Sequence, residues 1–247
     1  MIVRYETRDL DTPTGPMRTH VYTPAPAGAA RRYPGLLLYP EIYQQTGPIA
    51  RLSMFFAGHG YVVMAPEIYH EHEPPGTVLG YDTIGTDKGN DYKARTTLAT
   101  FDADAAVMLR ALEADPACSG RVGAVGFCLG GHLAFRAALR PDILAACCMY
   151  PTDLQGGILA GGACGDTLAR AREVRGELAL IWGRQDPHIP DAARAGIYRA
   201  LVEAGCVFTW HEFNAQHAFM RDEGPRYDPE AARLGLGVAL ALFRRTL

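Results

Sequence analysis

A cysteine in a glycine-rich run is the first residue of this chain that could do nucleophilic chemistry. The run GFCLGG, residues 126–131, places Cys128 between Gly126 and Gly130. This is the glycine–x–nucleophile–x–glycine pattern of a sharp strand-to-helix turn, where small neighbours avoid a collision with the strained backbone. A helix beginning after the thiol would supply free N–H groups that can bind an oxyanion. Cys128 is therefore the candidate nucleophile, and a buried core thiol is the alternative.

Two later residues complete a possible catalytic triad with this cysteine. Asp186 lies in WGRQDPHIP, just past an apolar run at 178–182, and His217 lies in FNAQHAF, just past another at 207–213. The order nucleophile, acid, histidine is the one found where such a turn carries the nucleophile. A histidine oriented by a carboxylate can help a thiol attack a carbonyl carbon. His188, two residues after the acid, is the nearest competitor for the base, but its position leaves it on the acid's own loop.

The elements that must position these residues alternate between strand and helix. Runs rich in β-forming residues occur at 2–7, 19–23, 35–39, 61–65, 121–126, 145–150, 178–182 and 207–213. Helical patterns occur at 93–114, 129–139, 190–203 and 228–245. The alternation predicts an α/β fold with a mostly parallel, eight-stranded sheet covered by helices on both faces. The C-terminal ends of parallel strands meet at one sheet edge, so the three candidate residues should lie together there. We expect residues 1–247 to form one domain.

Composition narrows the classes of partner and compartment. The chain has 247 residues, of which 48% are hydrophobic and 21% are charged, as in ordinary globular proteins. With 24 Lys and Arg against 27 Asp and Glu, the net charge is −3, and no basic stripe suggests a nucleic-acid partner. A charged N-terminus and no apolar run of membrane-spanning length predict no signal peptide, no membrane association and a cytoplasmic location. The six cysteines lack zinc-site spacing and are expected to be free thiols in a reducing compartment.

The chain resembles the dienelactone hydrolases, a cysteine-using branch of the α/β-hydrolase superfamily. The segments that carry the resemblance are GFCLGG, GRQDPHIP, QHAF and YPEIYQQT at 39–46, and it extends over essentially the whole chain. It implies an α/β-hydrolase fold and a hydrolase that cleaves a lactone or carboxylic ester, similar to carboxymethylenebutenolidase, through a Cys-His-Asp triad and a thioester acyl-enzyme. The implied partner is a small ester or lactone that carries a carboxylate. No cofactor or metal is implied, and the oligomeric state stays open.

The resemblance also implies roles for residues around the triad. Glu41 occupies the place of a glutamate that contacts the nucleophile thiol, and a carboxylate at the mouth of an apolar strand requires a partner. The backbone N–H groups of Ile42 and Leu129 correspond to the oxyanion hole. Arg221, four residues after the candidate histidine, corresponds to an arginine that pairs with the substrate carboxylate. Other residues expected to line the substrate pocket are Tyr43, Trp182 and Phe219.

The segment 67–93 departs from the family pattern because it is longer and richer in Gly, Asp and His than a plain connection requires. Loops over the C-terminal sheet edge shape the substrate pocket. A second family arginine, from the segment before the long helix, has no clean counterpart. The nearby cations are Lys88, Lys93 and Arg95. His70 and His72 could chelate zinc, but no third or fourth ligand at suitable spacing is evident, so we expect polar groups of the loop or pocket rim.

Two other functions use the same residues. A general carboxylesterase or thioesterase would share the triad but not the carboxylate recognition. A thiol redox sensor or a ligand-binding protein would use an accessible thiol without turnover. Cys147 and Cys148 are the candidate resolving cysteines of a sensor, although AACCMY has the pattern of a buried strand. His132, one helical turn after the nucleophile, is expected to be a packing residue.

Overall fold

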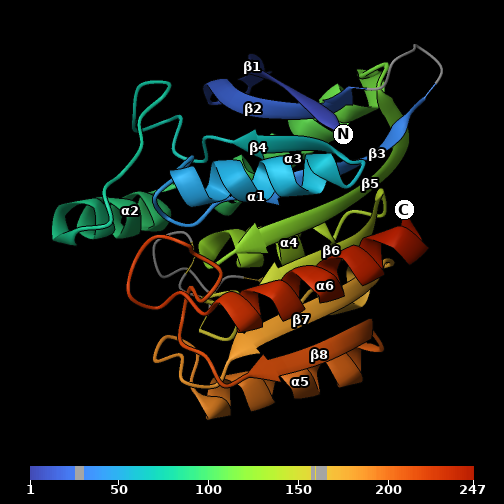
Figure 1. The fold of residues 1–247 in the computed structure, drawn as a ribbon. Coiled ribbons are helices and arrows are strands. Elements are labelled where there is room, and N and C mark those ends of the chain that lie inside the picture. The colour runs from blue at the N-terminus through green and yellow to red at the C-terminus, as the bar shows by residue number, and fades with distance from the viewer. Residues whose placement is uncertain (26–30, 157–158, 160–165) are drawn as a thin grey trace.

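A single eight-stranded sheet organises the part of the chain that the computed structural model describes, which is residues 1–25, 31–156, 159 and 166–247 (Figure 1). The strands are β1 (Ile2–Thr12), β2 (Gly15–Ala25), β3 (Tyr33–Tyr39), β4 (Val62–Pro66), β5 (Cys118–Phe127), β6 (Ile143–Met149), β7 (Glu177–Gly183) and β8 (Val207–Phe213). Their order across the sheet is β1-β2-β4-β3-β5-β6-β7-β8. β2 pairs antiparallel with both β1 and β4, and the remaining neighbours are parallel. The predicted mostly parallel α/β fold is confirmed.

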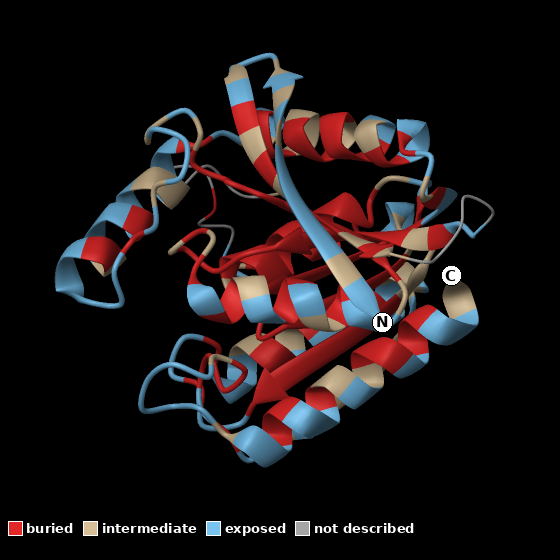
Figure 2. Ribbon diagram, turned by 45° about the horizontal axis from the view of Figure 1, so that its top comes forward, coloured by how far each residue is buried: buried red, intermediate tan, exposed pale blue. Residues whose placement is uncertain are grey.

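Helices cover both faces of this sheet. They are α1 (Gly47–Gly58), α2 (Thr83–Arg95), α3 (Leu98–Ala114), α4 (Leu129–Ala137), α5 (Asp191–Ala204) and α6 (Pro229–Thr246), with a short 3₁₀ helix, η1 (Ala171–Glu173). Figure 1 shows α1 and α6 in front of the sheet and α3, α4 and α5 behind it. The two front helices meet through Phe56 and Phe243, whose ring centroids lie 6.0 Å apart. Residues along the central strands are buried, whereas exposed positions lie on the outer helix faces, along β1 and in loops (Figure 2). None of the helices in the described ranges is both long and apolar enough to cross a bilayer.

The helix predicted at 93–114 is two helices in the structure. α2 ends at Arg95, and Thr96 has an extended backbone with ψ of 130°. Thr97 then begins α3 as its N-cap, because its hydroxyl accepts a hydrogen bond from the Thr100 N–H at 3.1 Å. A threonine at this position satisfies one of the orphan donors of a helix start, which favours a break at this point.

Helices α1 and α2 were not predicted from the sequence. α2 buries only Gly85 and Gly89, so it lacks the apolar stripe that marks an amphipathic helix. It begins at Asp82, whose carboxylate accepts from the Gly85 N–H at 2.7 Å. Its contacts with the body of the protein include a hydrogen bond from the Tyr69 hydroxyl to the Gly89 carbonyl at 2.8 Å and the packing of the Tyr92 ring against Tyr69. The segment 67–93 therefore brings a helix toward the C-terminal sheet edge.

Replacement of Thr97 by alanine should lower the free energy of unfolding by about 1 kcal/mol, because α3 loses its capping acceptor. Urea unfolding followed by circular dichroism measures this difference. Thr97→Ser keeps the hydroxyl and should remain close to the parent. Equal stability of the alanine variant and the parent would contradict the assigned cap.

Candidate active site

The turn between β5 and α4 holds Cys128 in a strained conformation. Its φ is 58° and its ψ is −120°, in a region that residues with a side chain rarely adopt. A β-carbon on Gly126 would lie 1.9 Å from the Gly130 carbonyl oxygen, and one on Gly130 would lie 2.2 Å from the Tyr39 oxygen. Only glycine fits at these two positions. The tight turn expected from the sequence is therefore present, and Cys128 is partly exposed at its tip.

Asp186 and His217 meet at the ends of two neighbouring strands. Asp186 follows β7, His217 follows β8, and these strands pair in parallel register. The distance between Asp186 Oδ2 and His217 Nδ1 is 2.6 Å, with both side chains buried. The other carboxylate oxygen of Asp186 accepts from the His188 N–H at 2.8 Å. These contacts fix the carboxylate and orient the imidazole ring.

The electrostatic surroundings of His217 favour its charged form. Burial opposes the charge on the imidazole. The charge and hydrogen bond of the Cys128 side chain act in the opposite direction, as does the Asp186 carboxylate. Together they outweigh burial and raise the His217 pKa to about 10. The ordinary value is 6.5. These surroundings therefore favour a protonated imidazole at His217, next to Cys128.

A cavity of ≈ 290 Å³ opens beside these residues. Cys128 and His217 both line it, and Asp186 lies behind the imidazole. Other lining residues are Glu41, Ile42, Tyr43, Thr86, Asn90, Lys93, Thr152, Asp153, His188, Ala218, Arg221 and Arg226. The cavity is of the size that binds a small organic molecule.

In the part of the chain that the structure describes, the backbone N–H groups of Ile42 and Leu129 donate to no backbone carbonyl of a turn, loop or helix cap. Leu129 is the first residue of α4, so its N–H is one of the donors that a helix leaves unpaired. Ile42 lies after β3 and lines the cavity. Its carbonyl packs on α2, where a β-carbon added to Gly89 would lie 2.5 Å from the Ile42 oxygen. The two N–H groups are free to bind an oxyanion.

Glu41 is buried beside Arg221 in the same cavity. Only 3% of Glu41 is exposed, and burial raises its pKa although Arg221 and His217 act in the opposite direction. The Glu41 Oε2 atom lies 3.6 Å from Arg221 Nη1 and has no hydrogen-bond partner among the described residues. The Arg221 guanidinium also lies 4.2 Å from the centre of the Tyr81 ring. Arg221 is thus held by a carboxylate and an aromatic face.

The model of the dienelactone hydrolase family matches residues 17–247. The chain belongs to the dienelactone hydrolase family. A putative carboxymethylenebutenolidase of Saccharomyces cerevisiae is 40% identical over 100% of this chain and 93% of the relative. A carboxymethylenebutenolidase of a Pseudomonas species is 28% identical over 88% of this chain and 87% of the relative. The structure of a putative dienelactone hydrolase from Klebsiella pneumoniae matches this one with a TM-score of 0.84 at 21% identity. The match covers 99% of this chain and 100% of the Klebsiella chain, and it supports the fold.

Three other residues were expected to line the pocket of this dienelactone hydrolase family member, and one of them, Tyr43, lines the cavity. Its hydroxyl shares a hydrogen bond of 2.9 Å with Thr86 of α2. Trp182 and Phe219 do not line the cavity, and both are fully buried. Trp182 stacks on Trp210 at 4.9 Å between ring centroids, while Phe219 packs in the core. These two residues therefore do not line the cavity as predicted, because Trp182 packs against Trp210 and Phe219 packs against Tyr150 and Phe213.

The cations of the cavity agree only in part with those that the sequence indicated. Lys93 lines the cavity and forms an ion pair with Asp153 at 2.9 Å, whereas Lys88 and Arg95 form ion pairs elsewhere. Arg226, which the sequence analysis did not single out, also lines the cavity. The signal that could have found it is its place in the loop that follows the candidate histidine, His217, at the C-terminal sheet edge.

The remaining histidines have separate roles. His132 is buried, its ring bonds to the Thr152 carbonyl at 2.9 Å, and burial lowers its pKa to about 4, as fits a packing residue. His188 lines the cavity with its ring centroid 4.8 Å from that of His217. His70 and His72 bond to different partners, Asp104 and Thr96. Among the described residues, no group of three metal-ligating side chains is present.

Replacement of Cys128 by alanine should lower the pKa of His217 from about 10, because the imidazolium loses the charge and the hydrogen bond of the thiol side chain. NMR titration of the His217 ring measures the change. Since the charged form is stabilised in the folded state, this contribution to stability is complete below pH 6.5 and is lost as pH rises through about 10. The parent should therefore lose unfolding free energy over that range, and the variant should lose less.

Cys206→Ala is the matched control for that titration, because the Cys206 thiol donates to the Ala171 carbonyl and does not line the cavity. Its His217 should titrate as in the parent. If His217 in Cys128→Ala titrates at the parent's pH, the thiol does not set the imidazole charge.

Proposed function

We propose that this protein hydrolyses a lactone or carboxylic ester through a Cys128–His217–Asp186 triad. The observation that carries the proposal is the meeting of a strained, partly exposed Cys128 with the Asp186–His217 pair at one cavity. Membership of the dienelactone hydrolase family supports the same chemistry.

The acylation step begins with a thiolate at Cys128 and an imidazolium at His217. The thiolate sulfur attacks the carbonyl carbon, and the N–H groups of Ile42 and Leu129 donate to the resulting oxyanion. The tetrahedral intermediate collapses by breaking the carbon–oxygen bond to the leaving group. His217 transfers its proton to that oxygen, which leaves a thioester and a neutral imidazole held by Asp186.

Deacylation regenerates the starting pair. The neutral His217 takes a proton from water as the water oxygen attacks the thioester carbon. The second tetrahedral intermediate expels the Cys128 thiolate and forms the carboxylic acid, while His217 keeps the proton. Because the charge of Cys128 is one of the groups that raise the His217 pKa, the imidazole is a better base in the thioester than in the free enzyme.

The proposed substrates carry a carboxylate that Arg221 binds. Arg221 lines the cavity, and its ion pair with Glu41 is long at 3.6 Å. A substrate carboxylate would compete with Glu41 for the guanidinium, and the freed Glu41 carboxylate would face the cavity that Cys128 also lines. Relatives named carboxymethylenebutenolidase support a carboxylated lactone.

A redox-sensor function has less support. Cys147 and Cys148 are fully buried in β6, and burial raises the pKa of both thiols. A resolving cysteine needs an accessible thiolate, so neither residue suits that role. A general esterase or thioesterase differs from the proposed function only in the contribution of Arg221.

Cys128→Ala should reduce kcat/KM for p-nitrophenyl acetate and for a dienelactone by about a thousandfold or more, as expected when a triad member is lost. Rapid quench of the parent followed by intact-mass measurement should show one acyl group on Cys128. Cys206→Ala should keep the parent rate and the acyl adduct. Turnover by Cys128→Ala at the parent rate would show that Cys128 is not the nucleophile.

Arg221→Met should lower kcat/KM about tenfold or more for a carboxylated lactone, roughly 1.4 kcal/mol of lost binding, and little for a neutral ester. Steady-state assays of both substrates measure the ratio. Arg110→Met, an exposed change on α3, should leave both rates at the parent level. Equal losses on both substrates would favour a general esterase.

A further inference from the structure

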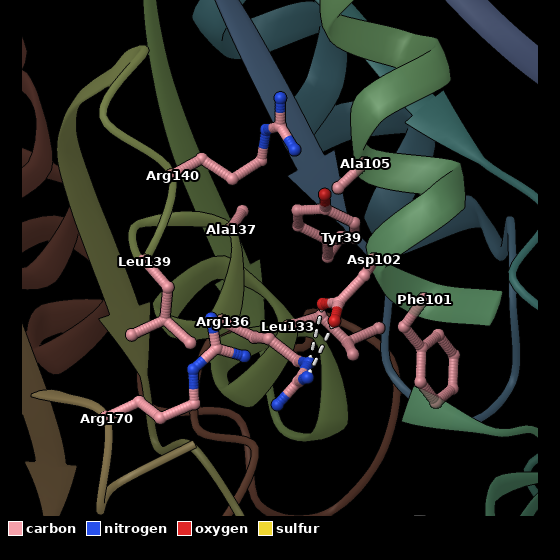
Figure 3. A pocket seen from close by; sticks show the side chains of 10 residues that line it. All are labelled: Tyr39, Phe101, Asp102, Ala105, Leu133, Arg136, Ala137, Leu139, Arg140 and Arg170. Atoms are coloured by element: carbon pink, nitrogen blue, oxygen red, sulfur yellow. Dashed lines mark hydrogen bonds and ion pairs between the residues drawn. The ribbon is translucent and has the colours of Figure 1, made fainter. Parts of the chain in front are cut away.

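A second cavity lies between α3 and α4, away from the proposed catalytic cavity. Its volume is ≈ 130 Å³, which is roughly that of four water molecules at ~30 Å³ each. Tyr39 of β3 forms one wall, residues of α3 and α4 form the sides, and Arg140 and Arg170 reach it from the following loops (Figure 3). No residue lines both cavities.

Two buried donors in this cavity have no acceptor. Tyr39 is 3% exposed, and its hydroxyl has no hydrogen-bond partner in the described residues. The Nε atom of Arg140 is buried and unpaired in the same way. Figure 3 shows the Tyr39 hydroxyl and the Arg140 guanidinium on either side of the space beside Ala105. Buried polar groups are nearly always paired, so a missing acceptor is indicated.

The other charged groups of the cavity are already engaged. Arg136 donates to both oxygens of Asp102 at 2.7 Å, which neutralises the one carboxylate in the lining. Arg170 donates to Glu173 at 2.8 and 2.9 Å.

Arg140, in contrast, has only a 3.5 Å contact with the half-exposed Asp142. It is therefore the lining cation with the most unused hydrogen-bonding capacity.

The hydroxyl of Tyr39 is available only as a neutral group. Burial, together with the charges of Asp104 and Asp102, raises its pKa far above the ordinary value, so the hydroxyl keeps its proton. A ligand at this place therefore meets a neutral O–H donor and a guanidinium donor. An acceptor with negative charge complements both groups.

We propose that this cavity is a binding site for a small oxyanion, either a carboxylate or a phosphate group, that accepts hydrogen bonds from Tyr39 Oη and Arg140 Nε. The site adjoins the nucleophile turn without being part of it. The Tyr39 carbonyl packs on Gly130, the second residue of α4, at the position where a β-carbon would lie 2.2 Å away. An occupant therefore stabilises the wall that supports the turn.

The test is thermal unfolding of the full chain at constant ionic strength, with sodium phosphate or sodium acetate titrated against chloride. The melting temperature should rise saturably with at least one of the two oxyanions. Calorimetric titration of the same salt should give the same dissociation constant. Absence of stabilisation and of binding heat with both salts would mean that water fills the cavity, and would overturn the proposal.

Three variants locate the bound anion. Tyr39→Phe and Arg140→Gln should each raise its dissociation constant about tenfold, or ~1.4 kcal/mol. Arg221→Met, in the catalytic cavity, should leave it unchanged. Loss of binding in Arg221→Met alone would place the anion in the catalytic cavity and overturn the proposal. Should Arg140→Gln fail to fold, the isosteric Tyr39→Phe decides, and parent-like affinity in that variant would overturn the proposal.

Discussion

The backbone bend at Cys128 is the constraint on which the rest of the site depends. A residue with a side chain in this region is strained by about 1–3 kcal/mol, so its surroundings must hold it there. Gly126 and Gly130 allow the chain to double back, and the Cys128 N–H donates to the Met149 carbonyl of β6 at 3.1 Å. The thiol is thereby fixed by β5, β6 and α4 together, and its position relative to His217 is a property of the whole sheet.

The surroundings of the cavity stabilise the charged form of one buried group, His217, and destabilise the charged form of another, Glu41. Asp186 and the thiol favour a charged His217, whereas burial disfavours a charged Glu41. Arg221 offsets part of that cost through its ion pair with Glu41. A negatively charged group that binds Arg221 would therefore change the charge balance around the nucleophile as well as anchor the substrate. Under the proposed function, substrate recognition and activation of the nucleophile would be coupled through the Arg221 guanidinium.

The strand ends and the meeting of Cys128, Asp186 and His217 at one cavity could be predicted from the sequence because both depend on local patterns. An apolar run followed by a polar residue locates a strand end, and parallel strands bring such ends to one edge. The side-chain direction at those ends could not be predicted in the same way. β7 is buried on both faces, so no alternation of polar and apolar residues shows that Trp182 faces the core. Phe219 packs against Tyr150 and Phe213, and its contact with Tyr150 joins segments far apart in the sequence, which no local pattern indicates.

The helix α2 and the presence of Arg226 in the cavity could not be predicted for a different reason, since they depend on contacts between segments far apart in sequence. α2 has almost no apolar surface, and its place is set by the approach of Gly89 to Ile42 and by hydrogen bonds from Tyr43 and Tyr69. Those contacts also connect α2 to a proposed oxyanion donor. A change in this segment would thus alter substrate binding and the position of a catalytic backbone group together, while the strand ends that hold the triad stay in place. The substrate preference of this chain is therefore expected to depend on α2 and on the loop after β8, where Arg221 and Arg226 lie.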